Sequence, residues 1–354
     1  MIKILIVDDS LTETMLLKSI FENEKDFEVV GIAKNGKDCL KKLKTLKPDI
    51  ITMDILMPEM DGLETTRQIM SQFPIPIVII SSTISKESVS QTFDALDAGA
   101  LAVLEKPEQN KEFEKSRTRI IDIVRSMSEI HVIKRRFFTK RKETKPILPL
   151  SLHHHVQPYY EIIAIAASVG GPQALKKILT ALPRDFPLPI VIVQHMMHGF
   201  INGFTTWLNN TTHLVIKSAE NHEILKGGTV YFAPDHHHME VKHDQYNLRI
   251  KLQSGPPISG FRPSATVLFQ SIAKECGENA IGIILTGMGN DGAEGLLEMK
   301  KAKGLTLIQD PESTVVFGMA GVAQSMGAVD KVIELDKIAD YLLKKIYANI
   351  SRHH

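Results

Sequence analysis

Five polar residues in the first third of the chain stand at the ends of short apolar runs that are typical of buried strands. They are Asp8 and Asp9 after the first run, Asp54 closing the third, Ser81 at the end of the fourth and Lys106 after the fifth. Because parallel strands of a doubly wound sheet end at one crevice, we expect these side chains to lie together. Three carboxylates repel one another unless a cation lies between them, and oxygen ligands suit Mg²⁺. An aspartate beside Mg²⁺ and a lysine can accept a phosphoryl group, because both cations neutralise its charge, and the Ser81 hydroxyl can bond one of its oxygens.

A serine and two glycines follow the first apolar run of the second half. The run Ile162–Ala167 leads into Ser168, Val169, Gly170, Gly171 and then a proline, which suits the first turn of a helix. This order predicts a tight strand-to-helix turn that lifts the serine hydroxyl to the top of the sheet. Backbone N–H groups of the turn can then stabilise an oxyanion. The same glycines also suit a nucleotide phosphate, although the full dinucleotide-binding pattern and a Walker A lysine are absent, so the loop by itself fits both interpretations.

A histidine and an aspartate follow two further apolar runs of the second half. His195 comes directly after the run that ends at Gln194, and Asp291 lies in a glycine-broken loop after the run Ala280–Leu285. A histidine at the tip of a buried strand can act as a general base, and an aspartate can orient it. Together with Ser168 they predict a nucleophile, a base and an orienting acid, with Met288 in the wall of the site.

The elements that position these residues alternate between β-branched apolar runs and stretches with helical spacing. The runs of the first half are Ile2–Val7, Glu28–Ala33, Asp49–Asp54, Pro76–Ser81 and Leu101–Glu105. Those of the second half are Ile162–Ala167, Leu188–Val193, Leu214–Ile216, Val230–Ala233, Ala280–Leu285, Leu305–Ile308 and Val329–Ile333. Helical spacing covers Leu11–Asn23, Gly36–Leu46, Pro172–Leu182 and Gly289–Lys301, and also extends from Gln109 to about Ser128. This alternation predicts an α/β protein with a doubly wound five-stranded domain, then a mostly parallel, Rossmann-like domain with a small antiparallel hairpin in Tyr231–Ile250.

Changes in composition divide the chain into four parts. They are a first domain over residues 1–125, a linker over 126–159, a second domain over 160–349 and a tail over 350–354. Lysines, arginines and three prolines gather within residues 134–158, which predicts a solvated basic tether. Two histidine triplets, at residues 153–155 and 236–238, are poor metal chelators as units, because consecutive residues of an extended segment point to opposite faces.

The composition is that of an ordinary soluble globular protein. The chain has 354 residues, enough for two or three domains, with 43% hydrophobic and 23% charged residues. A net charge of +1 gives no field that would favour nucleic acid or a membrane surface. Cys39 and Cys276 are far apart, which argues against a disulfide framework and for a reducing cytosol. Met1–Val7 is too short for a signal peptide, and no apolar run reaches the ~18 residues of a transmembrane segment, so we expect a cytoplasmic protein.

The first domain resembles the receiver domain of two-component response regulators over about residues 1–125. The matching motifs are Val7-Asp8-Asp9-Ser10, Asp54 with Met57-Pro58-Glu59-Met60-Asp61-Gly62, Ser81-Ser82 and Lys106-Pro107. The resemblance implies a flavodoxin-like fold in which Asp54 takes a phosphoryl group from a histidine kinase. It also implies that Asp9 and Asp54 bind Mg²⁺, with Asp8 joining through water, and that Ser81 and Lys106 sense the phosphoryl group.

The second domain resembles the catalytic domain of CheB, the chemotaxis protein-glutamate methylesterase family, over about residues 160–349. The matching motifs are Ala164-Ile165-Ala166-Ala167-Ser168-Val169-Gly170-Gly171-Pro172, Val193-Gln194-His195-Met196, Arg262-Pro263-Ser264, Leu285-Thr286-Gly287-Met288-Gly289-Asn290-Asp291-Gly292-Ala293 and Phe317-Gly318-Met319. The resemblance implies that Ser168 is the nucleophile, His195 the base and Asp291 its orienting acid, with no cofactor in this domain. The implied substrate is a glutamate methyl ester on a methyl-accepting chemoreceptor, and glutamine deamidation is a second activity within the family.

The chain departs from the pattern of these families at several positions. Val103 replaces the usual aromatic residue three positions before the receiver lysine, Ala167 replaces a glycine, and Val169 replaces a threonine beside the nucleophile. Ala265-Thr266 stands where Val-Asp is frequent. The changes beside Ser168 support a second hypothesis, in which the chain is a catalytically weak signalling adaptor that binds receptors or a kinase. A DNA-binding output domain is not expected, because the second half shows no helix-turn-helix signature.

Overall fold

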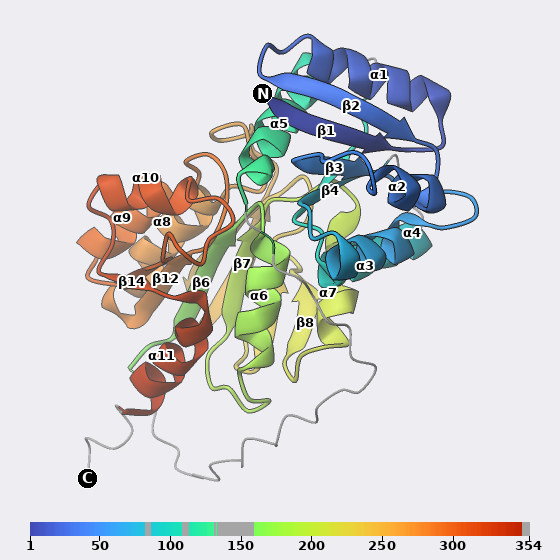
Figure 1. Ribbon diagram of the computed structural model, residues 1–354. Helices are drawn as coiled ribbons and strands as arrows, with labels where there is room; N and C mark the ends of the chain where they lie inside the picture. The colour runs from blue at the N-terminus through green and yellow to red at the C-terminus, as the bar shows by residue number, and fades with distance from the viewer. Residues whose placement is uncertain (82–85, 108–112, 131, 133–158, 349–354) are drawn as a thin grey trace. The chain divides into compact units, whose positions relative to one another are not determined.

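The computed structural model describes residues 1–81, 86–107, 113–130, 132 and 159–348 (Figure 1). The chain divides into two compact units, Met1–Thr144 and Lys145–His354, each with a parallel sheet of its own. The predicted basic tether of residues 134–158, the first histidine triplet and the tail of residues 350–354 lie outside the described residues. Within the described residues, no helix combines the length and the apolar character that crossing a membrane requires.

The first unit is a five-stranded parallel sheet in the order β2-β1-β3-β4-β5. Its strands are β1 (Ile2–Val7), β2 (Phe27–Ala33), β3 (Ile50–Met53), β4 (Ile77–Ser81) and β5 (Ala102–Glu105). Its helices are α1 (Leu11–Glu22), α2 (Gly36–Lys42), α3 (Gly62–Gln72), α4 (Lys86–Ala98) and α5 (Phe113–Ser128). The doubly wound architecture is the predicted one, and the strands begin and end within one residue of the predicted runs.

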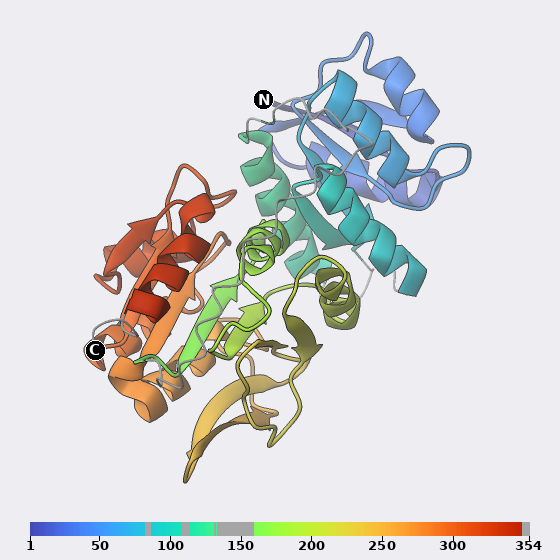
Figure 2. The same ribbon diagram turned by 90° about the horizontal axis from the view of Figure 1, so that it is seen from below.

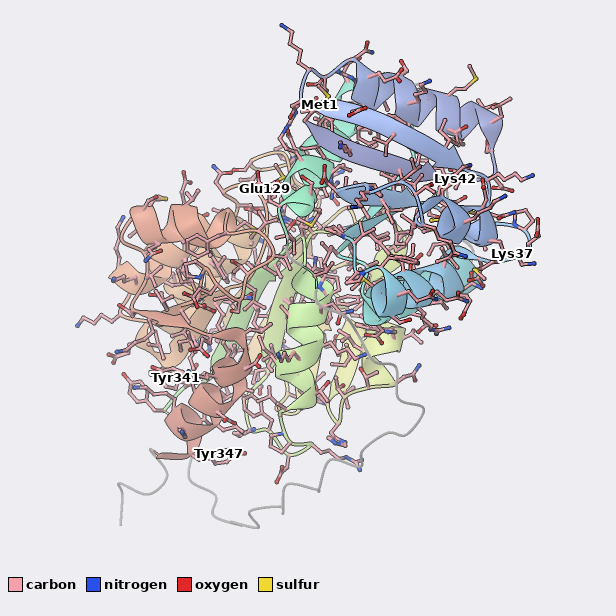
Figure 3. All side chains as sticks on the ribbon, viewed as in Figure 1. Met1, Lys37, Lys42, Glu129, Tyr341 and Tyr347 are labelled. Carbon is pink, nitrogen blue, oxygen red and sulfur yellow. The ribbon has the colours of Figure 1, made fainter. Side chains whose placement is uncertain are left out.

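Side-chain caps fix where three helices of this unit begin. The side chains of Ser10, Asn35 and Asp61 accept hydrogen bonds from the first turns of α1, α2 and α3, as polar N-cap residues do. At the other end of α2, Lys42 (Figure 3) donates to the Ile32 carbonyl at 2.5 Å and to Asp38 at 2.7 Å. The caps Ser10 and Asn35 lie within three residues of the ends of β1 and β2, so Asp8 and Asp9 are held at the end of β1.

The second unit is a seven-stranded parallel sheet in the order β14-β13-β12-β6-β7-β9-β8. Its strands are β6 (Ile162–Ala167), β7 (Ile190–Gln194), β8 (Val215–Ser218), β9 (Thr229–Phe232), β12 (Ala280–Ile284), β13 (Leu305–Gln309) and β14 (Lys331–Ile333). Its helices are α6 (Gly171–Thr180), α7 (Phe200–Asn209), α8 (Ala265–Cys276), α9 (Ala293–Lys301), α10 (Met319–Ser325) and α11 (Leu335–Ala348). A short 3-10 turn, Gly277–Asn279, follows α8. Tyr341 and Tyr347 lie on α11 (Figure 3).

The central strand β6 is where the winding of this sheet reverses. The chain leaves β6 through α6 toward β7, whereas β12 leads through α9 toward β13 on the other side. Right-handed crossovers in opposite directions place α6 and α9 on opposite faces of the sheet. Ligand sites of such sheets lie at the carboxyl ends of the strands beside the reversal, which here are β6, β7 and β12.

The antiparallel excursion is smaller than the sequence suggested. It consists of β10 (His238–Asp244) and β11 (Asn247–Gln253), which pair with each other and stand apart from the main sheet (Figure 2, in gold). The expected hairpin began at Tyr231, but that residue belongs to β9 of the parallel sheet. The predicted helix from Gly289 was also too long: Gly289 and Gly292 have φ of +90° and +89°, which helical residues do not adopt, and α9 starts at Ala293.

Candidate functional site

The acidic residues of the first unit meet at the carboxyl ends of β1 and β3. Carboxylate oxygens of Asp8, Asp9 and Asp54 all lie within 4.8 Å of one another. Asp8 and Asp54 are buried, whereas Asp9 is exposed. Lys106 follows β5 and reaches both buried carboxylates, with its Nζ 2.7 Å from Asp8 Oδ2 and 3.0 Å from Asp54 Oδ2. The structure therefore brings together the residues that the sequence placed at separate strand ends.

Burial and charge act on this pocket in opposite ways. Burial raises the pKa of the Asp54 carboxyl, and the neighbouring Lys106 offsets only part of that rise. Burial lowers the pKa of the Lys106 ammonium, but the hydrogen bonds and charges of Asp8 and Asp54 outweigh this, so its pKa lies above the usual value. The lysine is thus held charged beside a pair of carboxylates. The three acids offer only oxygen atoms as ligands, and the single charge of Lys106 does not balance them. A divalent ion such as Mg²⁺ fits such a set of ligands.

Two backbone contacts complete the first pocket. Ser81 is the last residue of β4, and its carbonyl accepts the Lys106 N–H at 3.1 Å, which places the serine beside the lysine. A Cβ on Gly62, the first residue of α3, would lie 2.0 Å from the Asp54 carbonyl oxygen. Because a backbone atom cannot move aside cheaply, this close approach admits glycine alone and seats α3 directly under Asp54.

In the second unit, the turn after β6 carries Ser168. Its N–H donates to the Thr286 carbonyl at 3.0 Å, and its carbonyl accepts the Gly171 N–H at 2.9 Å, which closes the turn. Gly170 has φ of +77°, and a Cβ there would meet the Val315 side chain at 2.7 Å. Among the described residues, the N–H groups of Val169 and Gly170 have no hydrogen-bond partner. The turn is therefore fixed by its glycine and by the neighbouring β12 loop, with two backbone donors left beside the serine.

His195 stands next to this turn because β6 and β7 are paired neighbours. Ala167 pairs with Gln194 in the sheet, and the His195 N–H donates to the Ala167 carbonyl at 2.9 Å. The buried Gln194 side chain donates to the carbonyls of both Ser168 and His195, at 2.9 and 2.8 Å. One amide side chain thus fixes the distance between the two strand ends.

The histidine ring is held by an aspartate. His195 Nε2 lies 2.9 Å from Asp291 Oδ2, and both side chains are buried. The other ring nitrogen, Nδ1, is buried and has no partner among the described residues. An ionised aspartate makes the facing nitrogen the protonated one, so Nδ1 carries the free lone pair. Nδ1 is therefore the nitrogen able to accept a proton.

Asp291 is held by a cradle that sequence reasoning did not find. Its Oδ1 accepts hydrogen bonds from the Ser264 hydroxyl at 2.6 Å, the Thr266 N–H at 3.1 Å and the Thr266 hydroxyl at 2.9 Å. Its Oδ2 also accepts the Ala265 N–H at 2.7 Å. These donors form the first turn of α8, whose N-terminus favours negative charge. Burial raises the pKa of Asp291, but the bond and charge of His195 and the Ser264 and Ala265 donors outweigh it and lower the pKa to about 2.

Phe261 is a second residue that the sequence did not single out. Its ring stacks on the His195 imidazole, with the ring centroids 4.0 Å apart and the planes only 2° from parallel. This stacking fixes the plane of the imidazole ring. No local signal marks this role, since Phe261 is far from His195 along the chain and lies in an irregular segment.

Thr266 offers a direct test of the cradle. Replacing it with valine keeps the volume but removes the hydroxyl that donates to Asp291 and accepts the Gly292 N–H at 2.8 Å. We expect Thr266→Val to lower the free energy of unfolding by about 1–3 kcal/mol, because two buried groups lose partners. Urea unfolding followed by the fluorescence of Trp207, the one tryptophan of the chain, reports on this unit. Thr266→Ser keeps the hydroxyl and should stay near the wild type; equal losses in both variants would contradict the assigned contacts.

The remaining predicted residues lie around the serine or apart from it. A Cβ on Gly287 would be 2.8 Å from Ser168 Cβ, so the loop that carries Met288 packs directly on the serine. The residues of the second histidine triplet diverge: His236 stacks on His198, His237 Nδ1 contacts the Asp235 carbonyl, and His238 is buried. The three side chains therefore make separate contacts.

Both units match known families. The family model described as response regulator receiver domain matches residues 4–117, and the one described as CheB methylesterase matches residues 163–342. The chain is similar to protein-glutamate methylesterase/protein-glutamine glutaminase 2 of Methanospirillum hungatei, with 43% identity over 93% of each chain. It is also similar to protein-glutamate methylesterase/protein-glutamine glutaminase 1 of Syntrophus aciditrophicus, with 42% identity over 97% of this chain and 98% of that one.

A solved structure agrees with the second unit. The catalytic domain of the CheB methylesterase of Thermotoga maritima is 36% identical and covers 52% of this chain and 98% of its own, with a TM-score of 0.51. The matched families define a response regulator whose output domain is a methylesterase with a mostly parallel α/β fold. The chain belongs to the CheB methylesterase family.

Proposed function

We propose that this chain is a phosphorylation-activated, cytoplasmic serine hydrolase that removes methyl esters from glutamates of chemoreceptors and so serves chemotaxis adaptation. The observation that carries the proposal is the pairing of His195 with an ionised, fully cradled Asp291 beside the Ser168 turn. These three side chains follow β6, β7 and β12, which are adjacent strands. A nucleophile, a base and an orienting acid in that relation are the parts that acyl transfer requires.

Acylation follows from the geometry of the turn. The Ser168 hydroxyl oxygen attacks the ester carbonyl carbon while its proton passes to His195 Nδ1. The resulting imidazolium is stabilised through Nε2 by Asp291, while the stacked Phe261 ring holds the plane of the imidazole. The N–H groups of Val169 and Gly170 stabilise the oxyanion, since the Gly171 N–H is already bonded to the Ser168 carbonyl. Collapse of the intermediate breaks the ester C–O bond, and the leaving methoxide takes the proton from His195 as methanol.

Deacylation uses the same residues in reverse. His195 accepts a proton from water, the hydroxide attacks the acyl-serine, and the proton returns to the Ser168 oxygen as the glutamate carboxylate leaves. A glutamine side chain enters the same route with ammonia as the leaving group. The two activities named for the relatives therefore need one set of residues, and the triad itself uses no cofactor.

The first unit is the proposed phosphoryl acceptor. Asp54 takes the group from a histidine kinase, and Asp8, Asp9 and Asp54 are the residues that would hold Mg²⁺. When bound, this ion supplies positive charge beside the acceptor. Lys106 supplies a second charge, since its ammonium already bridges Asp8 and Asp54, and Ser81 supplies a hydroxyl at the next strand end. Val103 lies half-buried in β5. The structural change that follows phosphorylation is therefore transmitted without an aromatic ring at this position.

The regulatory part of the proposal predicts a phosphodonor response. Methanol release from membranes that carry methylated chemoreceptors should rise about 5- to 150-fold when a small-molecule phosphodonor and Mg²⁺ are added, which corresponds to a coupling of ~1–3 kcal/mol. The rise should be absent in Asp54→Asn and in wild-type protein treated with a chelator. Equal release with and without phosphodonor, despite labelled Asp54, would remove phosphorylation control from the proposal.

The same assay separates the enzyme from the adaptor hypothesis. Val169 and Ala167 are the departures that motivated an adaptor, yet Val169 contributes to the turn through its backbone, where its carbonyl accepts the Thr286 hydroxyl at 2.9 Å. A methylesterase releases methanol in proportion to enzyme concentration. An adaptor would bind the receptor membranes in sedimentation and release none.

A further inference from the structure

A second cluster of reactive side chains lies at the opposite end of β6 from Ser168. Glu161 directly precedes β6, His243 lies on β10 and Cys276 is the last residue of α8. One ligand atom from each, a carboxylate oxygen, an imidazole nitrogen and the thiol sulfur, all lie within 4.8 Å of one another. Three different elements thus direct three different metal-binding groups to one point.

The spacing is close to that of a tetrahedral metal site. His243 Nε2 lies 3.6 Å from Glu161 Oε2. In a tetrahedral Zn²⁺ site with bonds of about 2.0–2.3 Å, nitrogen and oxygen ligands are about 3.3 Å apart, and sulfur and nitrogen about 3.6 Å apart. The Glu–His pair already has nearly that separation. The Cys276 sulfur lies within 4.8 Å of both of these atoms, so an approach of at most about 1.2 Å would give the sulfur spacing of such a site.

Neighbouring groups hold two of these residues in place. The Asn279 side chain donates to Glu161 Oε1 at 3.1 Å, which leaves Oε2 directed at the histidine. The Glu275 carboxylate accepts the His243 N–H at 3.1 Å and a hydrogen bond from Lys242 at 3.2 Å. The Asn279 bond orients the Glu161 carboxylate, as outer hydrogen bonds do for the ligands of metal sites, and the Glu275 bond fixes the backbone at His243.

Charge also favours a cation here. Cys276 is buried, and the Glu161 carboxylate lies beside it. A thiophilic divalent cation bound here would take the thiol as a thiolate, releasing its proton, and would offset the charge of Glu161.

We propose that Glu161, His243 and Cys276 form a Zn²⁺-type site that joins the β10–β11 hairpin to the base of the central strand. The six residues of β6 separate it from Ser168 by roughly 20 Å at about 3.3 Å per residue. The site therefore takes no part in ester hydrolysis, and its existence does not depend on the proposed function. Three protein ligands leave one position of the tetrahedron for water.

Cobalt provides a readout that is independent of activity. Titrating Co²⁺ into the reduced full-length protein, with excess Mg²⁺ present, should produce a thiolate-to-cobalt charge-transfer band that saturates at one equivalent and disappears when Zn²⁺ is added. Cys276→Ser should lose the band, and His243→Ala should weaken binding by about tenfold or more, as the loss of a group that holds a metal typically does. Cys39→Ser is the matched control, because Cys39 is a buried cysteine of the other unit and should leave the band intact.

Other metal-binding groups of the chain do not produce this charge-transfer band. The histidine triplets and the acidic pocket can bind Co²⁺, but they contain no thiolate and give no such band. Melting of Cys276→Ser followed by Trp207 fluorescence establishes that the variant is folded. No charge-transfer band at equimolar Co²⁺ in the reduced wild type, or a band of equal intensity in folded Cys276→Ser, would overturn the proposal.

Discussion

Replacing Ser168 with alanine should lower methanol release from methylated receptor membranes by about 10⁴-fold or more. The loss is large because the hydroxyl oxygen forms the acyl bond, and no neighbouring group can replace it. Ser168 is buried at the end of β6, and its turn is held by backbone contacts to Thr286 and Gly171. Removing one oxygen leaves those contacts in place, so the variant should fold and bind its substrate like the wild type.

The control for this variant is an equivalent change away from the turn. Ser325 is exposed at the end of α10, where its hydroxyl bonds the Val322 carbonyl, and Ser325→Ala should hydrolyse receptor esters at the wild-type rate. Phosphodonor labelling of Asp54 should be equal in all three proteins. Hydrolysis by Ser168→Ala near the wild-type rate would show that a different residue attacks the ester.

The fold could be predicted because its signal is local. Apolar runs such as Ile2–Val7 and Ile162–Ala167 are strands with those same bounds, since a strand buried on both faces needs an uninterrupted apolar segment. The strand ends also follow from sequence, and so the positions of Asp54, Ser168 and His195 relative to their sheets could be inferred. The errors have two causes: Tyr231 fits a hairpin and a parallel strand equally well, and the positive φ of Gly289 and Gly292 delays the start of α9.

The supporting contacts of the site could not be predicted, because they join segments that are distant in sequence. Asp291 meets Ser264 and Thr266 only once the loop after β12 reaches the start of α8. One signal was available: Ser264 and Thr266 begin an apolar helical stretch, and the first turn of a helix is a natural anion site. That signal predicts where a helix starts, but it does not identify Asp291 as the anion that binds there. The stacking of Phe261 on His195 has no sequence signal of this kind.

The departure at Thr266 has a physical consequence within this cradle. The Thr266 hydroxyl donates to Asp291 Oδ1 and accepts the Gly292 N–H, whereas an aspartate there would place a second carboxylate against Asp291. Like charges at that distance raise each other's pKa. In this chain the acid that orients His195 is thus surrounded by donors alone, which accords with its pKa of about 2.

Asp291→Asn should therefore damage both catalysis and stability. Both carboxylate oxygens accept hydrogen bonds, and an asparagine must turn its NH₂ group toward one set of donors. If the NH₂ faces His195, Nε2 becomes the acceptor and the proton moves to Nδ1, so the base nitrogen is lost. We expect the rate of methanol release to fall about 10⁴-fold, as for a wrong histidine tautomer, while Asp336→Asn, an exposed change on α11, should have no effect.

The stability of the variant should depend on pH in a way that identifies the carboxylate. A folded-state pKa of about 2, below the usual value of 3.8, means that the charged Asp291 stabilises the fold above pH ~4 and that this stabilisation is lost as the pH falls toward 2. Asparagine cannot ionise, so Asp291→Asn should be less stable than the wild type at neutral pH. Its deficit, measured by Trp207 fluorescence in urea, should shrink as the pH falls through that window. A stability deficit that stays constant from about pH 7 to pH 2 would mean that the substitution destabilises the fold through packing and not through the lost charge. His195 would then be oriented by its stacking on Phe261 and its bonds to β6 instead of by the charge of Asp291.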